Sequence, residues 1–160
     1  MDEPSPWLDA EQQRLWQDLL TVVIALPAAL DRQLQRDAGM SNFEYSVLAR
    51  LSMTDQDTMR LSALARDCDS TLPRLSKLMD RYEARGWIAR RIDPSDGRYT
   101  LATLTEAGRQ QVIDSAPGHV AQVRRLVFDP LTAGQRRNLG TALSRIAETV
   151  RREATGGGSG

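Results

Sequence analysis

The residues of this chain that could do chemistry are basic side chains at helical spacing, followed by an arginine in a tight turn. Arg74, Lys77 and Arg81 recur at intervals of three and four within TLPRLSKLMDRYEARG. In a helix they lie on one face, within about 60° of one another. Arg98 ends the turn DPSDGR, two residues after Asp96. Guanidinium and ammonium groups in this pattern are typical of contacts with phosphate and with base edges.

These basic residues gather in one part of a chain that is neutral as a whole. Lysine and arginine together number 21, and so do aspartate and glutamate, so the total charge indicates no particular partner. Residues 60–98 nevertheless hold nine basic side chains against six acidic ones. This local excess favours an anionic partner such as DNA. Basic side chains that only solvate helix surfaces are the alternative interpretation.

Enzyme and membrane functions have little support in the sequence. One histidine, His119, and one cysteine, Cys68, exclude an intramolecular disulfide and leave little material for a histidine-based triad or a structural zinc site. We predict no catalytic residue, metal or cofactor, and we expect the protein not to be an enzyme. Cys68 is either a redox-sensitive thiol or, as its expected place in an inward-packed turn favours, a small buried residue. With no apolar run near ~20 residues and no secretory signal, a cytoplasmic protein without a membrane partner is expected.

The N-terminal part should form one long helix over 8–38, because apolar residues recur there at spacings of three and four. Pro27 removes a backbone donor from this stretch and predicts a kink or a break near Ala25 and Leu26. Gly39 then offers a left-handed stop.

Two helices joined by a turn are expected in the middle of the chain. Ser41 and Glu44 form a capping-box pattern for a helix that ends near Met53. A polar loop follows, then a short helix over 59–68, and then a helix over 71–86.

A β-hairpin and two further helices complete the pattern. The β-prone runs 87–92 and 99–104 flank the turn DPSDGR and predict a hairpin. Thr105 should cap a helix that reaches about Phe128 and is perturbed near Pro117. The last helix should run from a second capping box, Thr132 to Gln135, to about Arg152, with the apolar stripe Leu139, Leu143, Ile146 and Val150.

The order helix, turn, helix, hairpin is that of a winged helix-turn-helix, so we predict a mainly α fold with a small β-hairpin wing (α+β). The DNA-binding domain is expected over 41–105. N- and C-terminal dimerisation helices, 8–38 and 106–152, should flank it, because neither can bury its stripe against so small a lobe. Residues 153–160, ending in TGGGSG, are expected to be a flexible tail.

In this context the segments LSKLMDRYEARGWIARR, DPSDGR and LTEAG resemble the MarR (multiple-antibiotic-resistance regulator) family of bacterial transcription factors, over about residues 10–152. The resemblance implies an α-rich homodimer whose first and last helices interlace, with each winged helix reaching one half-site. Two-fold symmetry would then favour an inverted-repeat operator in double-stranded DNA, with half-site centres about 34 Å apart.

Arg74 and Lys77 are the first choice for major-groove contacts. The resemblance makes Arg98 the wing arginine that enters the minor groove, with Asp96 two residues earlier to orient its guanidinium; an exposed ion pair of little consequence is the alternative. Thr71 and Pro73 are explained as well by helix capping and initiation as by DNA contact. The residues expected at DNA are Ser70, Thr71, Pro73, Arg74, Ser76, Lys77, Arg81, Arg90, Arg91, Asp96 and Arg98, with Arg90 and Arg91 at phosphates.

The resemblance also implies a small aromatic or anionic effector in a crevice beside the winged helix. Trp16, Phe43, Tyr45 and Met53 are the residues that could line it, although aromatic residues at helical spacing also fit a core. We therefore expect a dimeric, sequence-specific DNA-binding regulator that represses nearby genes. An effector is expected to relieve this repression. The alternative is a winged helix used for protein contacts, which predicts no salt-dependent binding to duplex DNA.

Overall fold

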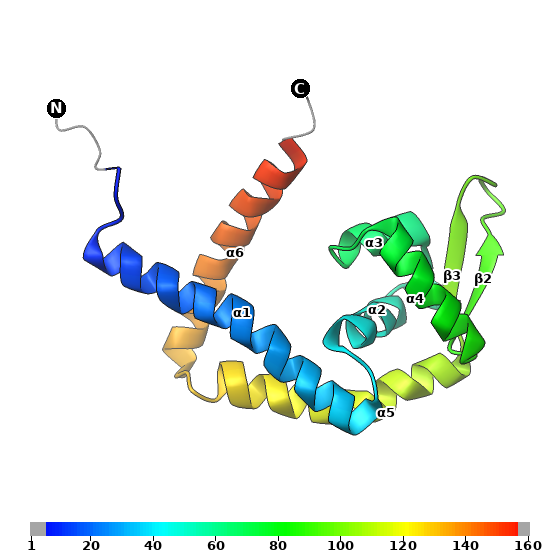
Figure 1. Ribbon diagram of the computed structural model, residues 1–160, viewed down its shortest axis with the longest axis horizontal. Helices are drawn as coiled ribbons and strands as arrows, with labels where there is room; N and C mark the ends of the chain where they lie inside the picture. Colours follow the sequence, from blue (N-terminus) through cyan, green and yellow to red (C-terminus); the bar gives the residue numbers. More distant parts are fainter. Residues whose placement is uncertain (1–5, 157–160) are drawn as a thin grey trace. The chain divides into compact units, whose positions relative to one another are not determined.

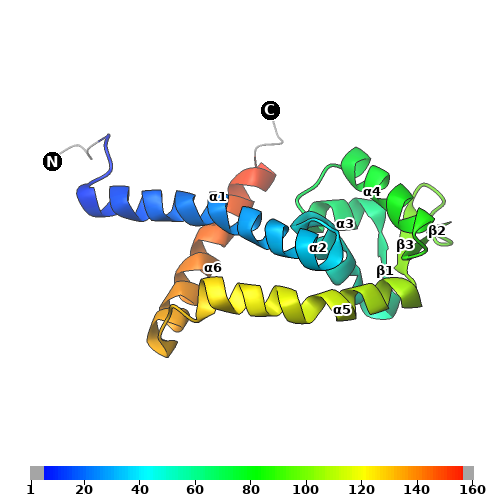
Figure 2. The same cartoon turned by 60° about the horizontal axis from the view of Figure 1, so that its bottom comes forward.

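The computed structural model describes residues 6–156 and divides them into two compact units, one within 6–120 and one within 121–156. The first unit contains the winged helix and is built from helices beside a small antiparallel sheet, as Figures 1 and 2 show. The prediction of a mainly α fold with a β-hairpin wing is confirmed. No helix among the described residues is long and apolar enough to cross a membrane.

Helix α1 spans Ala10–Ala38 and does not break at Pro27. Asp9 caps its start by accepting hydrogen bonds from two backbone amides at 2.8 Å, and Gly39 ends it in the left-handed conformation, with φ 63°. The expected break is therefore wrong. A proline removes one backbone bond, and the turns on either side hold this 29-residue helix together.

Helix α2, Asn42–Ser52, begins with the predicted capping box. The Ser41 hydroxyl accepts from the Glu44 amide at 3.1 Å, and the Glu44 carboxylate accepts from the Ser41 amide at 2.7 Å. Met53 follows as the C-cap, so the predicted end is also confirmed.

The segment after α2 contains a strand that the sequence analysis missed. A short 3-10 turn, Asp55–Asp57, leads into β1, Thr58–Arg60, and only then does α3, Leu61–Asp67, begin. Strand β1 pairs antiparallel with β3, and Figure 2 shows it beside that strand. The two strands of the wing thus belong to a three-stranded sheet with the order β1-β3-β2, in which β3 is the central strand. A three-residue strand is too short to show alternation, so Met59 and Arg60 were wrongly assigned to the helix.

Helix α4, Leu72–Ala84, runs beside the hairpin formed by β2, Ile88–Ile92, and β3, Thr100–Leu104 (Figure 1). Thr71 caps α4, and Gly86, with φ 70°, lies just beyond its end. The two strands pair in register from Ile88 with Leu104 to Ile92 with Thr100. The predicted helix and hairpin are confirmed.

Thr105 caps the next helix, α5, Glu106–Val123, because its hydroxyl accepts from the Gly108 amide at 3.1 Å. The helix passes Pro117 without a break. The irregularity lies instead at a π-helical turn, Arg124–Phe128, where the Asp129 amide donates to the Arg124 carbonyl at 2.8 Å. The perturbation predicted near Pro117 is therefore misplaced.

Helix α6, Ala133–Gly156, belongs to the second unit. The Thr132 and Gln135 capping box is confirmed, with the Thr132 amide donating to the Gln135 side chain at 2.9 Å. The helix ends four residues beyond the expected Arg152. Residues 157–160, part of the expected tail, lie outside the described residues.

The buried core holds the winged helix together and leaves long stretches of helix uncovered. It draws on the last turn of α1, on α2, α3 and α4, and on β2 and β3, whereas α6 contributes no buried side chain among 133–153. The core residues are Leu34, Met40, Tyr45, Val47, Leu48, Leu51, Leu61, Leu64, Ala65, Leu75, Leu78, Met79, Tyr82, Ile88, Ala102 and Leu104.

Candidate nucleic-acid interface

The basic row of α4 is divided between two environments. Lys77 is exposed and has no hydrogen-bond or ion-pair partner among the described residues. Arg74 places its guanidinium 4.0 Å from the centre of the Phe43 ring. Arg81 pairs with Glu44 at 2.7 Å. Helix α4 therefore presents two cations without an acidic partner and one that is engaged by α2.

The division follows from how much of α4 is buried. Leu78 is 2% exposed and extends the buried face formed by Leu75, Met79 and Tyr82. At 100° per residue, a buried face that includes Leu78 places Arg74 and Arg81 at the border of the core, where α2 lies. The spacing of the basic residues alone does not locate this buried face, so it could not separate the arginines from Lys77.

The polar residues predicted around the start of α4 lie at or near its exposed end. Thr71 and Pro73 are exposed, and the Thr71 hydroxyl accepts from the Arg74 amide at 3.4 Å, so it has the expected capping role. Ser70 is partly buried, and its hydroxyl bonds to the Thr71 carbonyl at 3.4 Å. Ser76 is partly buried and faces the wing.

The tip of the wing carries the expected pair of Arg98 and Asp96. The Arg98 Nε donates to one carboxylate oxygen at 3.0 Å and Nη2 donates to the other at 2.7 Å. These hydrogen bonds hold the pKa of Asp96 below its usual range. The Arg98 side chain is still 82% exposed. The pairing predicted from the sequence is confirmed, and it orients the guanidinium without covering it.

The base of the wing is held by a buried carboxylate, Asp93, which is 6% exposed. One of its oxygens accepts from the Ser95 amide at 2.8 Å and from the Ser95 hydroxyl at 2.7 Å, and the other accepts from Arg60 Nε at 2.7 Å. The hydrogen bonds from Ser95, and then those from Arg60, lower the pKa of Asp93 to about 2. The Arg60 guanidinium also lies 4.5 Å from the centre of the Tyr99 ring.

Sequence reasoning took Asp93 only as a turn residue and gave Arg60 no role. No signal in local spacing identifies the pair, because Arg60 and Asp93 lie 33 residues apart in the chain. The partner strand was not recognised, so the pairing could not be inferred.

Arg90 and Arg91 in β2 occupy different environments. Arg90 is 25% exposed and pairs with Asp80 at 2.8 Å and with Glu83 at 2.6 Å, both on α4. These acceptors raise the pKa of Arg90. Arg91 is exposed, without a recorded acceptor in the described part of the chain. Arg90 therefore fastens the hairpin to α4, whereas Arg91 remains open to a phosphate.

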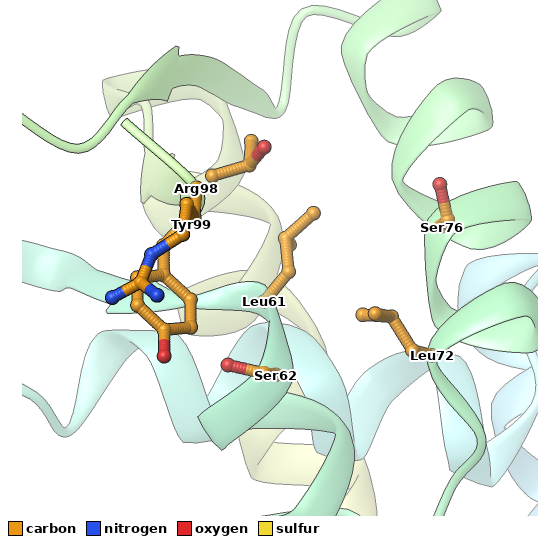
Figure 3. Close-up of a pocket in the computed structure, with 7 residues that line it drawn as sticks. Leu61, Ser62, Leu72, Ser76, Arg98 and Tyr99 are labelled. Atoms are coloured by element: carbon orange, nitrogen blue, oxygen red, sulfur yellow. The ribbon is translucent and has the colours of Figure 1, made fainter. Parts of the chain in front are cut away.

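A groove of about 220 Å³ separates α4 from the wing (Figure 3). Arg98 and Tyr99 stand on one side, Leu72 and Ser76 on the other, and α3 contributes residues between them. The groove combines an apolar floor with hydroxyl groups and one cation. Its lining residues are Leu61, Ser62, Leu72, Ser76, Arg98, Tyr99 and Thr100.

The four residues expected around an effector do not share one environment. Phe43 stacks on Arg74, whereas Tyr45, two residues along α2, is buried with its ring centre 4.6 Å from that of His119. Trp16 on α1 is 46% exposed and Met53 is 77% exposed. Phe43 and Tyr45 therefore point to different sides of α2 and do not line one crevice.

The cysteine and the histidine fit structural roles. Cys68 ends α3 and packs partly against the core, and burial, followed by the nearby Asp67, raises the pKa of its thiol. A thiol with a raised pKa is a poor nucleophile. Burial lowers the pKa of His119. Within residues 6–156 no cluster of three His, Cys, Asp or Glu side chains could hold a metal.

Comparisons with known proteins agree with this geometry. Residues 40–100 match the model of the MarR family. An uncharacterized HTH-type transcriptional regulator of Bacillus subtilis (strain 168), YxaD, is 32% identical over 91 residues, which are 57% of this chain; the chain spans 62%, less than two thirds, of that relative.

Two solved structures from Streptomyces coelicolor are similar over nearly the whole chain. Sco3205, a MarR family transcriptional regulator in complex with DNA, is 41% identical with a TM-score of 0.85, covering 93% of this chain and 92% of that one. AbsC, another MarR family transcriptional regulator, is 35% identical with a TM-score of 0.85, covering 92% and 99%.

Replacing Asp93 with asparagine should lower the melting temperature at about pH 7, and the difference from the wild type should shrink as the pH falls from about 4 to about 2. The carboxyl has a pKa of about 2 in the folded protein and about 3.9 in an unfolded chain. Its ionised form therefore stabilises the fold above the unfolded value, and the contribution is lost as the pH falls through the folded value. Thermal melts at a series of pH values measure this.

Asp55→Asn is the matched control, since Asp55 is exposed and its side chain has no recorded partner in the described residues. It should follow the wild-type pH dependence. A difference between Asp93→Asn and wild type that stays constant with pH would contradict the assignment.

Proposed function

The chain belongs to the MarR family of transcriptional regulators, and on that premise we propose that it acts as a homodimer that binds an inverted-repeat operator in duplex DNA and represses nearby genes. Its fold and family are those of a transcription regulator and not of an enzyme. The proposed partner is DNA, and we propose that the protein acts in the cytoplasm.

The observation that carries this proposal is that α4 and the wing, the two elements on either side of the groove, both carry exposed cations. Arg74 and Lys77 on α4 have no acidic partner among the described residues, and Arg98 lies on the wing with its side chain 82% exposed. A helix enters the major groove and a narrow minor groove attracts arginine. The strand backbone between the two DNA grooves would then lie against the groove of the protein, where Ser62, Ser76 and Thr100 offer hydroxyl groups.

The Asp96 pair suits Arg98 for this role. Asp96 accepts from Nε and Nη2 of Arg98, so it holds the guanidinium plane at a fixed angle. Nη1 has no acceptor within residues 6–156, so its donors are left for a base or sugar oxygen. An oriented side chain loses less entropy when it binds.

Dimerisation is supported by uncovered apolar residues on two helices. On α1, Val23 is 59% and Ile24 is 71% exposed. On α6, the predicted stripe is also open, from Leu139 at 38% to Val150 at 61%. Apolar surface of this extent marks an association site, and a second copy would cover both stripes. Two-fold symmetry then requires an operator with two equivalent half-sites.

Relief of repression by a small aromatic or anionic effector remains part of the proposal. Phe43 and Tyr45 are engaged within the fold, which leaves Trp16 and Met53 exposed for contact with such a ligand. Coupling requires the effector to bind more tightly to a state in which the α4 helices no longer match the operator.

The function is tested by selecting sites from a pool of randomised duplexes and measuring affinity for the selected site over a salt series. A regulator should recover an inverted repeat, and log Kd should rise linearly with log salt concentration because phosphate contacts release counterions. Absence of salt-dependent duplex binding would instead favour a winged helix that contacts proteins.

Arg98→Ala should weaken binding to the selected duplex roughly tenfold or more at fixed salt without lowering the melting temperature. The reason is that the side chain is exposed and bonds only within its own turn in the described structure. Arg137→Ala is the control, an exposed arginine of α6 outside the winged helix. Unchanged affinity of Arg98→Ala would remove the wing from the proposed interface.

Leu143→Glu should shift the protein toward monomers in sedimentation experiments, because it places a charge in the apolar stripe of α6. Leu143 is 45% exposed, so the change leaves the fold of a single chain intact. Thr141→Glu puts the same charge on the other side of α6 and should leave the dimer unchanged. Equal effects of the two variants would argue against α6 as a dimer interface.

A further inference from the structure

The contact between Arg74 and Phe43 joins α4, the helix proposed to contact the major groove, to α2. The guanidinium carbon of Arg74 lies 4.0 Å from the ring centre, well within the range of a cation–π contact. Phe43 is partly buried against the core, and Arg74 is exposed. The contact thus joins a fixed ring to a side chain at the protein surface.

The Phe43 ring is held in place because three interactions fix the first turn of α2. The capping box joins Ser41 to Glu44. Glu44 also pairs with Arg81 at 2.7 Å, and its carbonyl accepts from the Tyr82 hydroxyl at 2.7 Å. Since both of these partners lie on α4, the position of Phe43 is set relative to the helix that carries Arg74.

The N–H donors of a guanidinium lie in the plane of that group, and the contact of its central carbon with the Phe43 ring uses none of them as hydrogen-bond donors. No acceptor for the Arg74 side chain is recorded in the described residues, whereas Arg81 and Arg90 are bonded to carboxylates. Guanine offers O6 and N7 to such a planar pair of donors. Arg74 lies in the first turn of α4, and recognition helices read bases with their N-terminal residues.

We propose that Phe43 is a positioning residue for base recognition: its ring holds the Arg74 guanidinium so that the edge of that group faces guanine in the major groove. The inference rests on the proposed DNA-binding function and adds a residue outside α4 to the determinants of specificity. Without the ring, Arg74 keeps its charge and still attracts phosphate, but it loses the fixed orientation that distinguishes one base pair from another.

The test compares affinity for the duplex selected by the wild-type protein with affinity for a duplex of the same composition in shuffled order. The measured quantity is the ratio of the two dissociation constants. Phe43→Leu should lower this ratio roughly three- to tenfold, with little change in affinity for the shuffled duplex. Phe43→Trp keeps an aromatic face and should retain the wild-type ratio.

A double-mutant cycle separates positioning from a structural effect. If Phe43 acts through Arg74, Phe43→Leu should cause no further loss of discrimination in the Arg74→Ala background. Arg85→Ala is the matched control, because Arg85 stacks on Trp87 at 4.8 Å at the other end of α4 and should leave the ratio unchanged. Phe43→Met takes the place of the leucine variant if thermal melts show that the latter does not fold.

Retention of the wild-type ratio by the folded Phe43→Leu or Phe43→Met protein would overturn the inference, as would additive losses in the cycle. A wild-type protein that binds both duplexes equally would overturn the proposed sequence-specific function, and the inference with it. These two failures are distinguished by the wild-type measurement alone.

Discussion

The winged helix depends on one buried carboxylate, that of Asp93. It lies at the foot of the wing loop and accepts hydrogen bonds from Ser95 in the same loop and from Arg60 in β1. A buried carboxylate without partners is costly, so the loop is restrained to the one arrangement that satisfies it. Because α3 begins at Leu61, directly after Arg60, this contact joins the wing to the helix-turn-helix.

Further ion pairs extend this connection to α2 and α4. Glu44 joins the first turn of α2 to Arg81, and Arg90 joins β2 to Asp80 and Glu83. Exposed pairs of this kind contribute little free energy each, but together they set the orientation of one element against another. Most acidic residues of the winged helix thus have internal partners, while Arg74, Lys77 and Arg98 keep donors that face solvent. This explains how a chain with no net charge can present a basic surface.

The order of the elements could be predicted from the sequence because caps and turns are local. The capping boxes at Ser41 and Thr132, and the left-handed glycines 39 and 86, require only neighbouring residues. Strand β1 could not be predicted in the same way, because its three residues are a strand only through pairing with β3, more than forty residues later.

The individual site residues were predicted more readily than their partners. Asp96 with Arg98 is a contact two residues apart, and it was anticipated. The stack of Arg74 on Phe43 and the pair of Arg60 with Asp93 each join residues about thirty positions apart. Nothing in local spacing indicates such contacts, since they arise from tertiary packing. The same limit applies to Phe43 and Tyr45, which were grouped as neighbours although they face different sides of α2.

The central claim is that α4 and the wing of each protomer occupy adjacent DNA grooves at one half-site. Chemical footprinting of the dimer on its selected duplex tests this most directly, using methylation of guanine N7 in the major groove and adenine N3 in the minor groove. The account predicts two equivalent protected half-sites about 34 Å apart, each with major-groove protection beside minor-groove protection. A single asymmetric footprint would contradict it. Half-sites in which guanine N7 and adenine N3 stay accessible to methylation would contradict it as well.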